Sequence, residues 1–144
     1  FADDLGISAV TLCDTIGVAN PTQTLSVLRG IQQTFPKMDI GLHLHNTHGM
    51  ALACMFAGVQ SGVTRFETAV GGLGGCPFAP GAAGNAATED AVNMFNRMGH
   101  DTGISLPDLL DIANLIRSTI EPTLLSSLSR ARTYSEFDFC SEKI

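Results

Sequence analysis

The sequence has little positive charge and few large aromatic residues. Its 144 residues hold eight lysines and arginines against fourteen aspartates and glutamates, a formal net charge of −6, with one tyrosine and no tryptophan. Because an acidic surface repels phosphate backbones, we expect no nucleic-acid partner. The chain also lacks a basic amphipathic stretch and any apolar run near the ~20 residues that span a bilayer, so we expect no membrane association. The composition is that of an ordinary globular domain whose thin coat of charge leaves room for a buried interface.

Paired cysteine motifs and a signal peptide are also absent. The four cysteines, at positions 13, 54, 76 and 140, form no CxxC pair, which disfavours a structural zinc site. The composition does not resemble that of a disulfide-rich secreted domain. The first five residues carry acids instead of the basic segment that begins a signal peptide. We therefore predict free thiols in a reducing, cytoplasmic compartment, or a mitochondrial one if a presequence precedes this chain.

Strand-like and helix-like segments alternate along the chain. Strands are predicted at residues 7–13, 38–45 and 63–70, and helices at 22–35, 49–62, 86–98 and 107–119. This alternation predicts a parallel sheet with right-handed crossovers. A sheet of three parallel strands leaves two open edges, which favours a piece of a closed barrel over an isolated flavodoxin-like sheet. The polar tail from residue 126 is predicted to be partly disordered.

Polar residues or glycines follow each predicted strand, at the edge where parallel α/β folds build their active sites. Asp14 and Thr15 follow the first strand, and a glycine-rich loop follows the third. His43 and His45 end the second strand, and alternate residues of a strand point to one side, about 6.5–7 Å apart at Cα. That spacing suits two ligands of one metal ion, although two hydrogen-bonded histidines at a strand end remain the alternative. With two imidazoles and no thiolate pair, the site does not resemble a closed structural zinc site.

The glycine-rich segment 71–81 contains Cys76, which is preceded by glycines and followed by Pro77 and Pro80. A flexible linker is one interpretation, but its place after a strand favours a lid that delivers a thiol to a substrate. The pattern leaves open whether that thiol is a nucleophile or a proton donor. Asn85 precedes the next predicted helix, and on position alone a helix cap is favoured over a metal ligand. Glu89 and Asp90 in the first turn of that helix complement its dipole, and His48 is interpreted as a loop residue.

The longest motif then carries a resemblance to a known family. Gly72-Leu-Gly-Gly-Cys-Pro-Phe-Ala-Pro-Gly81, followed by Gly84-Asn85 and Ala87-Thr-Glu-Asp90, resembles the signature region of hydroxymethylglutaryl-CoA lyases. Asp14-Thr-Ile-Gly17 and His43-Leu-His45 match the same family in order. The resemblance implies an α/β fold, namely the C-terminal portion of a TIM (βα)₈ barrel with about three βα units. It covers residues 1–120, and residues 121–144 would form a C-terminal helical extension.

The resemblance also implies a site and a reaction. It implies a divalent cation, Mg²⁺ or Mn²⁺, with His43, His45 and Asn85 as ligands, in place of the cap that position alone favours for Asn85. The implied catalytic residues are Cys76, Asp14 and His43, and the implied substrate-binding residues are Thr15, Gly74 and Gly75. The implied reaction is cleavage of 3-hydroxy-3-methylglutaryl-CoA to acetyl-CoA and acetoacetate, with a bound metal stabilising the developing charge.

Some residues depart from the family pattern. Asn46 stands where these lyases usually carry aspartate, and His48 replaces a more usual tyrosine or arginine. The run His45-Asn46-Thr47 leans toward the isopropylmalate and homocitrate synthases, so a Claisen-condensing acyltransferase is the alternative function. The family's first strands supply an Arg-Asp pair and a glutamate that this sequence does not contain. We therefore expect the chain alone to be a nearly inactive half-barrel, whose partners are an acyl-CoA substrate, the missing N-terminal half of the barrel and further copies in a homo-oligomer.

Overall fold

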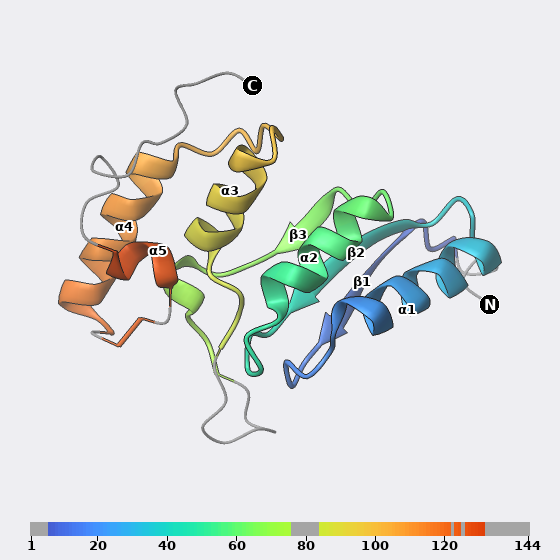
Figure 1. Ribbon diagram of the computed structural model, residues 1–144, viewed down its shortest axis with the longest axis horizontal. Coiled ribbons are helices and arrows are strands. Elements are labelled where there is room, and N and C mark those ends of the chain that lie inside the picture. The colour runs from blue at the N-terminus through green and yellow to red at the C-terminus, as the bar shows by residue number, and fades with distance from the viewer. Residues whose placement is uncertain (1–5, 76–83, 122, 125, 132–144) are drawn as a thin grey trace.

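The computed structural model describes residues 6–75, 84–121, 123–124 and 126–131 (Figure 1). Three strands are present, β1 (Ala9–Asp14), β2 (Asp39–Leu44) and β3 (Arg65–Glu67). The helices are α1 (Pro21–Thr34), α2 (Ala51–Gln60), α3 (Thr88–Arg97), α4 (Leu106–Thr119) and α5 (Ser127–Arg130), and a 3₁₀ turn, η1, covers Val70–Gly72. Within the described part of the chain, none of the helices is long and apolar enough to cross a membrane.

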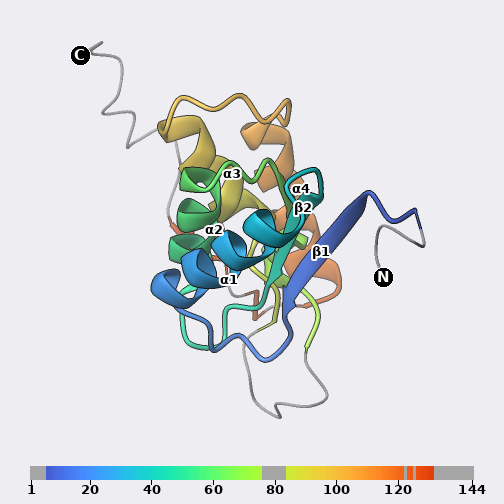
Figure 2. The same ribbon diagram turned by 90° about the vertical axis from the view of Figure 1, so that its right-hand side faces the viewer.

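The three strands form one parallel sheet in the order β1-β2-β3. The register pairs Cys13 with His43 and His43 with Glu67, so the carboxyl ends of the strands meet at one edge. The helices α1 and α2 connect consecutive strands and lie on the same face of the sheet (Figure 2). This arrangement confirms the predicted parallel α/β organisation.

Alternation along β2 separates an apolar face from a polar one. Ile40, Leu42 and Leu44 are buried beneath the helices, where they pack with Leu28 of α1 and Met55 of α2. Burying each such side chain stabilises the fold by about 1.5–3 kcal/mol relative to leaving it in water. The apolar face of the sheet and its two helices therefore provide most of the larger core cluster, to which α3 adds Ala91 and Phe95.

The opposite face of the sheet carries polar side chains. It presents Thr11 and Cys13 from β1, Asp39 and His43 from β2, and Arg65 and Glu67 from β3. Each of these residues is half-buried or exposed, and Arg65 pairs with Asp39 at 3.1 Å between Nη1 and Oδ2. In a closed barrel this face would line the interior. We call it the inner face.

Each of the four predicted helices begins one or two residues from its predicted start, and the first and third show what sets the start. The first helix was predicted to begin at residue 22, but α1 begins at Pro21 and Asn20 caps it in a capping box with Gln23. Helix α3 begins at Thr88 with Ala87 at the cap position, so a capping role for Asn85 is wrong. Asn85 lies too far back in the chain because its own backbone pairs with the end of β2 instead.

The third strand is shorter than predicted. It ends at Glu67 and not at residue 70, because Ala69 pairs with residues 86–88 and the chain then turns into η1. The hydroxyls of Thr68 and Thr88 are 2.9 Å apart and join the same two segments. The glycine-rich segment after β3 therefore begins from a fixed turn.

The C-terminal helices pack on α3 at the side of the sheet (Figure 1). Asp90 of α3 accepts hydrogen bonds from the Ser127 and Leu128 backbone amides, at 2.8 and 2.7 Å, and from the Ser126 hydroxyl at 3.1 Å. This carboxylate holds the first residues of the tail that was predicted to be partly disordered, and the partial disorder stays a prediction. The rest of that prediction, 132–144, lies outside the described residues, and the proposed boundary at residue 120 stays a prediction.

We predict that Asp90→Ala releases α5 from α3. Hydrogen bonds to a charged group contribute about 1.5–3 kcal/mol each, so the amides of Ser127 and Leu128 should exchange faster with deuterium in the variant. Hydrogen exchange with mass spectrometry measures this protection. Asp111→Ala, at an exposed position of α4, is the matched control and should change nothing. Equal protection in the wild-type chain and in Asp90→Ala would contradict the assignment.

Candidate functional site

His43 and His45 lie together at the carboxyl end of β2. Their ring centroids are 5.4 Å apart and the rings are tilted by 59° to one another, as two side chains on one face of a strand should be. His45 is 8% exposed, while His43 is half-buried. Burial lowers the pKa of the His45 imidazole, the neighbouring His43 lowers it further, and Asp14 acts in the opposite sense. His45 is therefore held in the neutral form that binds metal ions.

Backbone pairing brings Asn85 to the same place. The amide of Asn46 donates to Gly84 O at 3.0 Å, the amide of Ala86 donates to Leu44 O at 3.0 Å, and Asn85 forms a bridge with His45. Gly84 also lets the glycine-rich segment approach from the other side, since a Cβ there would lie 1.8 Å from Gly74 O. Asn85, the third predicted metal ligand, thus lies beside the predicted ligands at the end of β2.

The Asn85 amide group is oriented by its own hydrogen bond. Its Nδ2 donates to Leu73 O at 2.7 Å, which leaves Oδ1 buried with no hydrogen-bond partner among the described residues. A Cβ added at Gly74 would lie 2.8 Å from Nδ2, so this glycine packs against the amide. The loop that begins at Leu73 therefore fixes which atom of Asn85 is free to bind a ligand.

These three side chains fit a metal ion in their donor chemistry. Buried polar groups are normally paired, yet Nδ1 of His45 and Oδ1 of Asn85 are buried and unpaired within the described part of the chain, and Nδ1 of His43 has only the Glu67 carboxylate 3.4 Å away, without an aligned hydrogen bond. Two imidazoles and one amide oxygen suit a divalent cation that completes its shell with water or substrate oxygens. The described residues contain no cluster of three or more His, Cys, Asp or Glu placed to hold a metal, so any ligand set here depends on Asn85.

Asp14 lies at the end of β1, where its carboxylate organises the following loop. Oδ1 accepts from the amides of Gly17 and Val18 at 3.0 and 3.2 Å, and Oδ2 accepts from Ala19 at 2.9 Å. These bonds use three of the roughly four acceptor sites of a carboxylate. What the structure shows for Asp14 is a loop-ordering role, and the implied catalytic role stays a prediction. Thr15 is exposed in this loop.

A buried glutamate fixes the start of the glycine-rich loop. Glu89 is completely buried, and both carboxylate oxygens accept from the amide of Gly71, at 3.1 and 3.0 Å. Gly71 has φ = 66°, a conformation that favours glycine. Glu89 therefore does more than complement the helix dipole. Gly74 and Gly75 are exposed beyond this anchor, and the predicted catalytic residue Cys76 lies outside the described residues.

Three residues to which the sequence analysis gave no role are placed by the structure. Cys13 is exposed on the inner face, while Cys54 is buried and burial raises the pKa of its thiol, so Cys54 stays protonated. Glu67, which the sequence analysis did not single out, has Oε2 3.4 Å from Nδ1 of His43. Glu67 lies opposite His43 in the register of β2 and β3. The sequence could not show this, because the contact depends on how the strands are paired.

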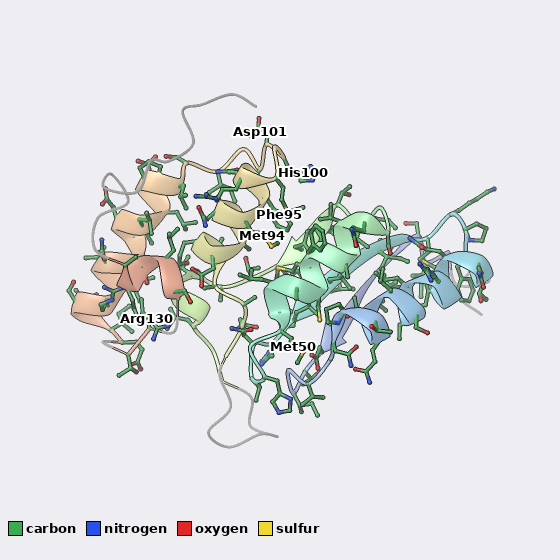
Figure 3. The ribbon with its side chains drawn as sticks, viewed as in Figure 1. Met50, Met94, Phe95, His100, Asp101 and Arg130 are labelled. Carbon is green, nitrogen blue, oxygen red and sulfur yellow. The ribbon has the colours of Figure 1, made fainter. Side chains whose placement is uncertain are left out.

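A cavity of about 500 Å³ lies away from this site, between β3 and α3. Phe66 and Phe95 line it with their rings 5.0 Å apart, and His100 and Asp101 lie at its rim beyond the end of α3 (Figure 3). Most of its lining is apolar, and it contains none of the predicted site residues. The chemistry indicated by the sequence is therefore at the strand ends and not in this cavity.

Comparison with known proteins gives a consistent result. A family model described as HMGL-like matches residues 1–116. A hydroxymethylglutaryl-CoA lyase of Bacillus subtilis is 47% identical over 85% of this chain and 41% of its own length, and an (R)-citramalyl-CoA lyase of Chloroflexus aurantiacus is 42% identical over 90% and 41%. The structure of an HMG-CoA lyase from Acinetobacter baumannii with coenzyme A and 3-methylmalate matches 94% of this chain and 44% of that one, with 39% identity and a TM-score of 0.84.

More distant structures share the fold alone. The carboxyl transferase domain of Rhizobium etli pyruvate carboxylase is 20% identical, with a TM-score of 0.62 over 78% of this chain. The chain spans about two fifths of the length of the curated lyases that it matches. The TIM-barrel fragment predicted from the sequence is confirmed by its similarity to the lyase structures.

We predict that the chain binds Mn²⁺ through His43, His45 and Asn85. Alanine at any of the three removes one donor, so each variant should bind Mn²⁺ more weakly in a calorimetric titration. His48→Ala is the control, because His48 is exposed and only its backbone amide bonds to Gly17 O. Equal affinity in the wild-type chain and all three variants would show that the cation binds elsewhere.

We predict that His45 makes the fold less stable in acid. Because its pKa is lowered in the folded chain, the unfolded chain binds more protons once the pH falls below the ordinary imidazole pKa of about 6.5. The free energy of unfolding should therefore decrease as pH falls from about 6.5 toward the folded pKa, and this part of the decrease should be missing in His45→Gln. Urea denaturation at a series of pH values measures it, and identical slopes for both chains would contradict the prediction.

Proposed function

Because this chain belongs to the HMGL-like family, we propose that it forms the metal-binding part of a carbon–carbon lyase that acts on 3-hydroxy-3-methylglutaryl-CoA. The observation that carries the proposal is the juxtaposition of His43, His45 and Asn85, in which Nδ1 of His45 and Oδ1 of Asn85 are buried without a hydrogen-bond partner in the described part of the chain. Relatives at 36–47% identity that are named as hydroxymethylglutaryl-CoA lyases support the choice of substrate. The cation would be Mg²⁺ or Mn²⁺, since an amide oxygen and substrate oxygens are ligands that hard cations prefer.

The reaction requires stabilisation of negative charge at oxygen. The hydroxyl of the substrate loses its proton, the bond between C2 and C3 breaks, acetoacetate leaves with a new carbonyl, and the enolate of acetyl-CoA takes up a proton. A bound divalent cation would acidify the hydroxyl and stabilise the oxyanion. His43, His45 and Asn85 would hold that cation, and the lowered pKa of His45 keeps a neutral nitrogen available for it.

The other described residues position the two loops that follow the strands. The Asp14 carboxylate orders residues 15–19, and Glu89 fixes Gly71 at the base of the glycine-rich loop. The resemblance assigns proton donation to Cys76, on that same loop. We propose that the Cys76 thiol protonates the enolate and that Thr15, Gly74 and Gly75 contact the acyl-CoA. The catalytic base and the other strands of the barrel would come from segments that the longer relatives contain and this sequence does not include.

A second substrate has specific support. The Chloroflexus aurantiacus relative is named as an (R)-citramalyl-CoA lyase and is 42% identical, so citramalyl-CoA is the alternative acyl group. The acyltransferase alternative depended on Asn46, but its Oδ1 accepts from the Ala51 amide at 3.1 Å at the start of α2. A structural role thus accounts for Asn46, and lyase chemistry is the proposal that we favour.

We predict that a chimera will show the lyase activity. The chimera is the Bacillus subtilis lyase in which this chain replaces the segment that it matches. The remaining Bacillus segment would then supply the other strands, and the two parts together would close the barrel. The chimera should cleave 3-hydroxy-3-methylglutaryl-CoA to acetyl-CoA and acetoacetate in the presence of Mg²⁺, and His43→Ala in the chimera should abolish cleavage. The chain alone should be nearly inactive.

The chimera also separates the alternatives. Preferred cleavage of citramalyl-CoA would replace the proposed substrate and keep the lyase class. Release of free CoA from acetyl-CoA in the presence of a 2-oxo acid, without carbon–carbon cleavage of 3-hydroxy-3-methylglutaryl-CoA or citramalyl-CoA, would favour an acyltransferase. A folded chimera with none of these activities would contradict the proposed function.

A further inference from the structure

The inner face of the sheet holds a carboxylate directly beside one of the predicted metal ligands. Glu67 pairs with His43 in the parallel register of β2 and β3, so their side chains project from the same face. Oε2 of Glu67 is 3.4 Å from Nδ1 of His43. The contact lacks the alignment of a full hydrogen bond, so Nδ1 has no hydrogen-bond partner in the described part of the chain. A buried ring nitrogen that faces a carboxylate is nonetheless the atom most able to carry the imidazole proton.

The other oxygen of Glu67 is held in place by Thr11. The Thr11 hydroxyl donates to Oε1 at 2.8 Å, across the full width of the sheet. Gly41 lies between them in the register, and a Cβ there would come within 3.2 Å of Thr11 Oγ1. The absence of a side chain at position 41 therefore lets the carboxylate of β3 reach the hydroxyl of β1, and that bond directs Oε2 toward His43.

No other charged group on this face competes for Glu67. Arg65 is engaged by Asp39 at 3.1 Å and by the carbonyl oxygen of Val10 at 3.0 Å. Cys13, the remaining neighbour in the register, turns its thiol toward Thr11 O at 3.8 Å. Among the described residues, His43 and Thr11 are thus the partners of the Glu67 carboxylate.

We propose that Glu67 is a positioning residue that fixes the proton of His43 on Nδ1 and leaves Nε2 as the metal-binding nitrogen. Metal-bound histidines commonly donate their second ring N–H to a carboxylate, which sets the tautomer and the orientation of the ring. The metal-binding role of Nε2 rests on the proposed function, whereas the tautomer of His43 is a property of the metal-free chain. Glu67 itself is not a ligand in this account.

The test reads the tautomer of His43 by nitrogen-15 NMR in the metal-free 144-residue chain. At about pH 8, well above the ordinary imidazole pKa, the wild-type spectrum should show a protonated Nδ1 and an unprotonated Nε2. Glu67→Ala should shift His43 toward the form with its proton on Nε2. Thr11→Val keeps the β-branched shape of the strand and removes only the hydroxyl, so it should shift the balance in the same direction by a smaller amount.

Asp39→Ala is the matched control. It removes a carboxylate from the same face while Arg65 keeps its bond to Val10 O, and the His43 tautomer should not change. An unchanged His43 tautomer in a folded Glu67→Ala chain would overturn the proposal, whatever happens to metal affinity. A tautomer that shifts in both test variants and not in Asp39→Ala would support it.

Manganese binding by the same variants separates this proposal from the proposed function. Loss of a carboxylate that positions a metal-bound histidine typically weakens metal binding by about 10–100-fold. The Glu67→Ala variant should therefore bind Mn²⁺ more weakly than wild type by about that factor. If the tautomer shifts as expected but the wild-type chain binds no Mn²⁺, the positioning role holds and the metal site proposed for this chain fails. If Mn²⁺ binds equally well to wild type and Glu67→Ala, the role of Glu67 in metal binding is overturned.

Discussion

The hydrogen bonds between the end of β2 and residues 84–86 determine where the other groups of the site lie. Asn46 donates to Gly84 O, and Ala86 donates to Leu44 O, so Asn85 is held beside His45 although forty residues separate them in the sequence. Directly after this pairing, residues 86–88 pair with Ala69 and α3 begins. Glu89 of α3 then accepts a hydrogen bond from the amide of Gly71. The glycine-rich loop is therefore fixed at both ends against the strand that carries the two histidines. The close approach of Gly84 to Gly74 O makes this packing possible.

Much of this arrangement could be predicted from the sequence, because it depends on local periodicity. Alternation predicted that His43 and His45 share one face, and helix-length spacers between strands predicted a parallel sheet. The rule that parallel strands gather their polar ends at one edge placed Asp14 near the histidines. The motif beginning at Gly72 then indicated the family, which the comparisons confirm.

The features that the sequence did not reveal depend on contacts between distant segments. Asn85 looked like a helix cap because nothing local shows that its backbone pairs with β2. Glu67 seemed to be an ordinary strand residue, since its contact with His43 requires the register of β2 and β3. The resemblance gave Asp14 a catalytic role, and the sequence did not reveal that its carboxylate also accepts from three amides of the loop that follows it. In each case a short-range pattern predicted the position of the residue and not the direction of its side chain.

The central claim is that His43, His45 and Asn85 converge on one divalent cation. Pulsed electron paramagnetic resonance of bound Mn²⁺ tests it most directly, with the chain labelled with nitrogen-15 at histidine. The account predicts hyperfine couplings to two inequivalent imidazole nitrogens, one of which disappears in His43→Ala and the other in His45→Ala. A bound Mn²⁺ that shows no imidazole coupling would contradict it, because the cation would then lie outside the site that the backbone pairing builds.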